Sequence, residues 1–146
     1  EGHGQGTTLI IYTGTGNAFV GPNGSCDNWQ MRNFRLICSN PLNTGDGIRL
    51  IGDLSSVNTH ILLDNVAIWS FGRWGLNADN LQSSIIRGCH FRENKAGHIR
   101  IIDNDDVDPV KEPNANCIID CLLDNSPAND NNVAGIKLFN ANGTRI

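Results

Sequence analysis

The stretch Ile86-Arg87-Gly88-Cys89-His90-Phe91 decides the fold, because its pattern occurs four times along the chain. The pattern is an apolar residue, a variable residue and then Asn, Asp or Gly, followed by an apolar, a variable and an apolar residue. The other three copies are Met31–Leu36, Leu63–Ile68 and Ile118–Leu123. Their third positions, 33, 65, 88 and 120, are separated by 32, 23 and 32 residues. The chain therefore repeats one short unit, with loops of different length between the copies.

A second unit, apolar-variable-apolar, follows each copy of the first one. Its copies are Ile48–Leu50, Leu76–Ala78, Ile99–Ile101 and Ile136–Leu138, each with a Gly one or two places ahead. Short alternating strands between Asn- and Gly-rich turns, with no helix-length amphipathic stretch, predict an all-β chain. Two strands in each repeat predict a single-stranded parallel β-helix of about five coils.

Each coil of such a helix pairs with the next, so equivalent positions stack about 4.8 Å apart. We predict a turn column of Asn33, Asn65 and Asp120, whose short side chains would bond neighbouring backbone. Cys89 and Cys121 are predicted to be small apolar core residues. The predicted inward columns are Phe34, Val66, Cys89 and Cys121; Leu36, Ile68, Phe91 and Leu123; and Ile48, Leu76, Ile99 and Ile136.

A β-sandwich is the competing fold, but it does not require equivalent positions to recur in register. The β-helix is therefore favoured, as a single domain over residues 1–146. About five coils would leave unpaired strands at both ends, and the chain starts at Glu1 without a leader. We expect a segment of a longer β-helix.

Composition limits the possible partners. The chain has 20 Asn but only 3 Lys, a net charge of −4 and a pI of about 5.4, which argues against nucleic acid. No apolar run approaches the roughly 20 residues that span a bilayer, so no membrane insertion is expected.

The five cysteines have irregular spacing, which is not typical of a disulfide framework. On a strand, Cys117 and Cys121 would lie roughly 13 Å apart, beyond the reach of a disulfide. A zinc site would also need a second ligand pair. We therefore expect no bound metal or cofactor from these residues.

The run from Gly6 to Val20, then Trp29–Leu36 and Gly45–Ile48, resembles the right-handed β-helix of the pectin-lyase-like superfamily. More narrowly it is similar to bacteriophage tailspikes and tail-fibre proteins of that fold. The resemblance implies a long polysaccharide ligand, a homotrimer and a place in the virion tail or outside the cell. It does not select an activity, because the superfamily includes pectate lyases, polygalacturonases, alginate epimerases and capsule depolymerases. The Gly97-His98 pair matches one element of the polygalacturonase pattern, but the carboxylates that should precede it are missing.

The longest insertion between repeats, residues 103–113, is acidic and offers the candidate catalytic residues. Glycoside hydrolysis needs two carboxyl groups about 5 Å apart for retention or about 6.5–9.5 Å apart for inversion. Asp103, Asp105 and Asp106 could supply such a pair. The Asp103–Asp108 stretch could instead bind Ca²⁺, although it lacks the EF-hand pattern. The third interpretation is a solvated surface loop.

Candidate ligand-binding residues occur in two places. Trp69, Phe71, Arg73 and Trp74 gather aromatic rings and a cation at one turn, where they could stack on a sugar. Alternatively these rings form a packed corner, with Trp69 the more buried because it follows the inward Ile68. The outward column Arg49, Asn77, Arg100 and Lys137 could follow an acidic polysaccharide, or could be an ordinary solvated sheet face.

We therefore expect a tailspike-type segment that recognises a bacterial surface polysaccharide. The alternative is a polysaccharide-degrading enzyme, a glycoside hydrolase or lyase, that uses the acidic loop. The second alternative is a structural spacer without a ligand.

Overall fold

The computed structural model describes residues 8–21, 26–52, 57–103, 113–124 and 134–146. Within these ranges the chain forms strands and turns and no helix, so none of this part could cross a membrane as a helix. The first coil contains β1 (Leu9–Tyr12) and β2 (Phe19–Val20), and the second β3 (Gln30–Cys38), β4 (Ile48–Leu50) and β5 (Asn58–Thr59). The third coil contains β6 (Leu62–Trp69), β7 (Trp74–Asp79) and β8 (Leu81–Gln82). The fourth contains β9 (Ile85–Arg87), β10 (His90–Arg92) and β11 (Gly97–Ile102), and the fifth β12 (Cys117–Ile119), β13 (Leu122–Asp124) and β14 (Ala134–Phe139).

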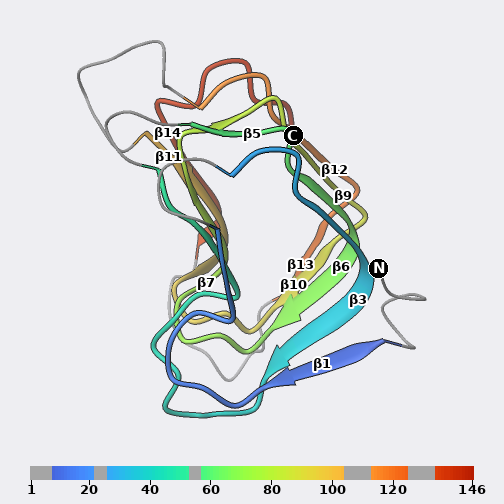
Figure 1. Ribbon diagram of the computed structural model, residues 1–146, viewed down its shortest axis with the longest axis vertical. Helices are drawn as coiled ribbons and strands as arrows, with labels where there is room; N and C mark the ends of the chain where they lie inside the picture. The colour runs from blue at the N-terminus through green and yellow to red at the C-terminus, as the bar shows by residue number, and fades with distance from the viewer. Residues whose placement is uncertain (1–7, 22–25, 53–56, 104–112, 125–133) are drawn as a thin grey trace.

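These strands form three sheets in which every pairing is parallel. Sheet A has the order β1-β3-β6-β10-β13, with β9 and β12 continuing from the first half of β6, and sheet B has the order β14-β11-β7-β4-β2. Sheet C pairs β5 with β8. In Figure 1 the chain winds clockwise as it recedes from the blue N-terminal coil, down through sheet A and up through sheet B. The fold is the predicted right-handed parallel β-helix.

The strand register confirms the predicted columns. On sheet A, Leu36 pairs with Ile68, which in turn pairs with Phe91. On sheet B, the column runs through Ile48, Leu76, Ile99 and Ile136 without a slip. Ile68, Phe91 and Ile99 are completely buried, and each such side chain contributes about 1.5–3 kcal/mol to stability. The core is one continuous apolar stack along the helix axis.

The corners of the coils use left-handed backbone. The turn column Asn33, Asn65, Gly88 and Asp120 has φ values of 59°, 55°, 58° and 52°. Asn and Asp tolerate this conformation better than other side chains, and Gly has no steric cost there. Asn65 Nδ2 donates to Asn33 Oδ1 at 2.9 Å, so this pair bonds side chain to side chain and not to neighbouring backbone as predicted. The frequent Asn residues are therefore a consequence of the corner geometry.

Buried asparagines complete the corners by pairing backbone groups that no strand satisfies. Asn58 Oδ1 accepts from the Cys26 amide at 3.0 Å, and its Nδ2 donates to the Asp79 carbonyl at 2.7 Å. Asn43 Oδ1 accepts from the Gly45 and Gly72 amides at 3.0 and 2.8 Å. Since a buried backbone group without a partner costs about 1–3 kcal/mol, these side chains hold successive coils together.

Candidate ligand-binding face

The outer face of sheet B carries the predicted cationic row. Arg49 pairs with Asn77, Asn77 with Arg100 and Arg100 with Lys137, each on the next coil. Neighbouring members are therefore about 4.8 Å apart along the axis. The Arg49 and Arg100 side chains are 18% and 22% exposed, whereas Lys137 is an exposed residue. We call Arg49, Asn77, Arg100 and Lys137 the outer row.

A buried carboxylate lies beneath this row. Asp79 is two residues after Asn77 on β7, and its side chain is only 2% exposed. Arg49 Nη2 donates to Asp79 Oδ2 in an ion pair, and Arg100 Nη1 lies 3.6 Å from Asp79 Oδ1. One carboxylate therefore holds arginines from the second and the fourth coil. A carboxylate buried to this extent is tolerated only when cations and donors surround it.

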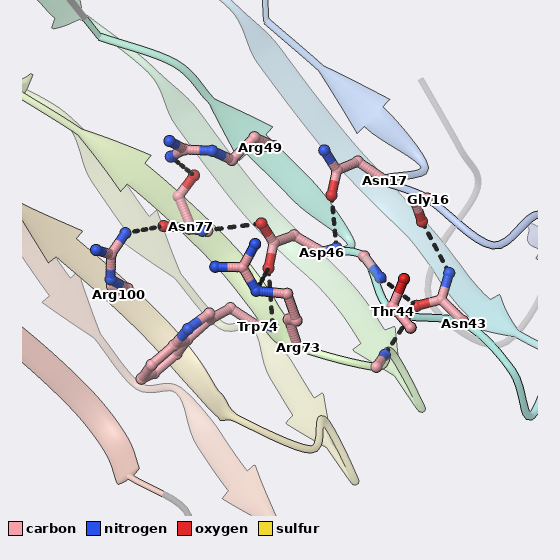
Figure 2. A network of polar contacts seen from close by, with 12 residues as sticks. Gly16, Asn17, Asn43, Thr44, Asp46, Arg49, Arg73, Trp74, Asn77 and Arg100 are labelled. Carbon is pink, nitrogen blue, oxygen red and sulfur yellow. Dashed lines mark hydrogen bonds and ion pairs between the residues drawn. The ribbon is translucent and has the colours of Figure 1, made fainter.

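Asn77 connects the row to a second buried carboxylate, Asp46 (Figure 2). Asn77 Oδ1 accepts from Arg100 Nη1 at 2.6 Å, and Asn77 Nδ2 donates to Asp46 Oδ2 at 2.8 Å. The other Asp46 oxygen accepts from the Trp74 amide at 3.0 Å and lies 3.9 Å from Arg73 Nε. Asp46 is completely buried, while the Arg73 side chain is 52% exposed.

Among the described residues, this face carries four cations, Arg49, Arg73, Arg100 and Lys137. The first three lie near the buried carboxylates of Asp46 and Asp79. Burial lowers the pKa of Arg100 from its ordinary value, and the nearby Asp79 carboxylate opposes that shift. Among the described residues no ion pair involves Lys137. The face offers donors to an anion, with Arg73 and Lys137 most accessible.

The aromatic turn matches the packed-corner interpretation for two of its three rings. Phe71 is completely buried and stacks with Tyr12 at 6.0 Å between ring centroids, and Trp74 is only 8% exposed. Neither ring presents a face to a sugar in this structure, because both pack against the protein. The expectation that Trp69 would be the more buried tryptophan was wrong, because Trp74 is the buried one. Trp69 is half-buried on the outer face of sheet A, because side chains alternate along a strand and the preceding Ile68 points inward.

Trp69 belongs to a cationic cluster on that other face. The Arg35 guanidinium lies 4.2 Å and that of Arg92 5.6 Å from the Trp69 ring centroid. The His90 ring meets Trp69 edge to face at 5.3 Å. Burial lowers the pKa of His90, and the nearby Asp124 carboxylate opposes this. Trp69 is thus engaged by cations and lies on a different sheet from Arg73 and Trp74.

The acidic loop is described only at its two ends, Asp103 and Pro113. Asp103 is 7% exposed, and its Oδ2 accepts from Asn140 Nδ2 at 3.3 Å. Asp105, Asp106 and the rest of the Asp103–Asp108 calcium candidate lie outside the described residues. Within the described ranges, no group of three or more His, Cys, Asp or Glu is arranged to hold a metal ion. His98, the histidine of the Gly97-His98 pair, is completely buried.

Sequence reasoning missed Asp46 and Asp79, which position the arginines. Alternation along the strand carried the information for Asp79, since it lies two residues after the outward Asn77. Nothing in the local pattern distinguishes Asp46, which is placed by its contacts with the next coil.

The fold and this face together define a class, a right-handed parallel β-helix with a cationic outer sheet held by buried carboxylates. No protein-family model, curated protein or solved structure matches the chain.

Proposed function

We propose that the chain is a β-helix of the tailspike or tail-fibre type within the pectin-lyase-like superfamily, and that it recognises an acidic bacterial surface polysaccharide. The observation that carries the proposal is the outer row, in which three of four successive coils place a cation in register on a chain with negative net charge. A linear glycan with a carboxylate in each repeat also presents charges at regular intervals. The proposed setting is the virion tail or the cell exterior, as a homotrimer.

The buried aspartates support binding more directly than catalysis. Asp79 is engaged by Arg49 and Arg100, and Asp46 by Asn77 and the Trp74 amide. Carboxylates held in this way orient the guanidinium groups before a ligand arrives, which reduces the entropy that binding would otherwise cost. Guanidinium groups suit carboxylate ligands because their N–H groups form a planar fork.

The test is retention of a panel of capsule and lipopolysaccharide polymers by the immobilised chain, with acidic and neutral members of similar length. We expect retention of an acidic polymer and weaker retention as salt concentration rises, because the contacts are ionic. Replacing both accessible cations, Arg73→Gln with Lys137→Gln, should weaken retention by about tenfold, since exposed ion pairs are each worth roughly 0.2–1 kcal/mol.

Arg87→Gln is the matched control, because it removes one exposed cation from the outer face of sheet A. It should change retention far less than the double variant. Equal retention of neutral and acidic polymers, or an equal effect of Arg87→Gln, would contradict the proposed face.

A fall in polymer size would favour the depolymerase alternative and direct attention to Asp103, Asp105 and Asp106. No retention and no shortening would favour the spacer. The molar mass in solution, measured by light scattering, tests the proposed homotrimer: three times the chain mass would support it, and the mass of one chain would contradict it.

A further inference from the structure

Two thiols of the core column are direct neighbours in space. Cys89 lies between β9 and β10, and Cys121 occupies the equivalent place between β12 and β13. Backbone bonds fix the register on both sides, from Gly88 N to Ile119 O at 3.0 Å and from Leu122 N to Cys89 O at 2.9 Å. Adjacent parallel strands are about 4.8 Å apart, within the Cα separation of about 4.4–6.8 Å that disulfides require.

The two thiols have different environments. Cys89 is 1% exposed, whereas Cys121 is half-buried. A side-chain hydrogen bond links the Cys89 and Cys121 thiols, and this contact lowers the pKa of Cys121 to about 7. The same contact, together with burial, raises the pKa of Cys89. Cys121 is thus the more nucleophilic of the two, because the thiolate is the reactive form.

The other three cysteines lack such a partner. All five cysteines lie among the described residues, and only Cys89 and Cys121 occupy equivalent positions on adjacent coils. Burial and the neighbouring Asp27 carboxylate raise the pKa of Cys26 to about 11. Cys117 pairs in register with Ile85 and not with a second thiol.

We propose that Cys89 and Cys121 form an oxidation-sensitive pair, which a peroxide converts to a disulfide joining the fourth and fifth coils. The Cys121 thiolate attacks one peroxide oxygen, the O–O bond breaks, and Cys121 becomes a sulfenic acid as hydroxide leaves. The Cys89 sulfur, after losing its proton, attacks the sulfenic sulfur; the S–S bond forms and the S–O bond breaks. With hydrogen peroxide, two thiols lose two electrons and two water molecules are released.

The bond would fasten the fifth coil, because it ties β13 to the neighbouring β10. The same coil contains β14 with Lys137. The inference does not depend on glycan binding, since it concerns only the core column.

The test treats the reduced chain with hydrogen peroxide, alkylates the remaining thiols and maps the peptides by mass spectrometry. We expect the Cys89 and Cys121 peptides to be joined, with Cys26, Cys38 and Cys117 alkylated. Hydrogen exchange in β13 should slow by about tenfold in the oxidised chain, because a cross-link suppresses local opening. Five alkylated thiols after peroxide, or a bond through a different cysteine, would overturn the proposal.

Two variants separate the roles of the thiols. Cys117→Ser, which removes another half-buried thiol of the fifth coil, should leave the cross-link unchanged. Cys89→Ser, which keeps a hydroxyl that can donate to Cys121, should prevent the cross-link and leave a sulfenic acid on Cys121 that dimedone captures. If circular dichroism shows that Cys89→Ser is unfolded, the wild-type peptide map alone decides. A folded Cys89→Ser chain without dimedone label on Cys121 would contradict the order of attack.

Discussion

The outer faces of sheets A and B carry the same kind of pair in two different states. On sheet A, Arg87 Nε and Nη2 donate to both oxygens of Asp64 at 3.0 and 2.9 Å, with side chains 51% and 23% exposed. On sheet B, Asp79 is 2% exposed and is shared by Arg49 and Arg100. The Asp64–Arg87 pair has the better geometry, but water screens it. The comparison teaches that burial, and not the register of opposite charges, decides what such a pair contributes.

The largest expected difference in stability is between two single variants, one that removes the Asp79 carboxylate and one that removes the Asp64 carboxylate. Asp79→Ala should lower the free energy of unfolding by about 3 kcal/mol, because it leaves two partly buried arginines without their carboxylate. Asp64→Ala should lower it by less than about 1 kcal/mol, because Arg87 returns to water. Urea unfolding of both variants provides the measurement. Equal losses would show that the two faces do not differ energetically.

Glycines on the two sheets provide the next comparison. A Cβ on Gly97 of β11 would lie 2.1 Å from the Trp74 ring, at a φ of +154°. Gly97→Ala should therefore cost about 2 kcal/mol or more, as an overpacked site does. Gly88, at the turn of sheet A with φ +58°, has its nearest neighbour 3.9 Å away, so Gly88→Ala should cost only about 1 kcal/mol of backbone strain. Thermal unfolding should rank them in this order, and the reverse order would contradict the Trp74 contact.

Added salt should weaken the exposed Asp64–Arg87 ion pair much more than the buried Asp79–Arg49 ion pair. Arg87→Gln should lower the free energy of unfolding slightly at low ionic strength and hardly at all at 1 M salt, where charges are screened beyond about 3 Å. Arg49→Gln should retain most of its cost at 1 M salt, because Asp79 is shielded from solvent. The check is urea unfolding of both variants at two salt concentrations. Similar salt sensitivity would mean that Asp79 is more accessible than its 2% exposure indicates.

The smallest expected effect is on how stability depends on pH in the acid range. The hydrogen bond from Arg87 is the main cause that lowers the pKa of Asp64 from its ordinary value, and the charge of Arg87 adds to it. Because the folded pKa lies below the unfolded value, this stabilisation is complete above the unfolded pKa and is lost as pH falls through the folded pKa. NMR titration should show the lowered pKa in the wild type and a return toward the ordinary value in Arg87→Gln. An unchanged Asp64 titration would rule out Arg87 as the cause.

Sequence reasoning predicted most of the fold but only part of the candidate site. The columns through Ile68 and Ile99 followed from periodicity, because a parallel stack forces equivalent positions into register. The outer row was found in the same way. Phe71 and Trp74 were placed less well, because the chain turns a corner between β6 and β7 and period-two alternation does not apply across it. Trp69 is still in β6 and follows the alternation, which the expectation of its burial overlooked.

The sequence by itself determined the coil register, the inward columns and the residue types at the left-handed corners, because these depend on local periodicity and backbone sterics. Only the tertiary structure decided which charges are buried. Both carboxylates are covered by groups from neighbouring coils. Asp46 is covered by Arg73 and Asn77. Asp79 is covered by Arg49 and Arg100. The pairing of Cys89 with Cys121 has the same origin, since residues 32 positions apart meet only when two coils stack.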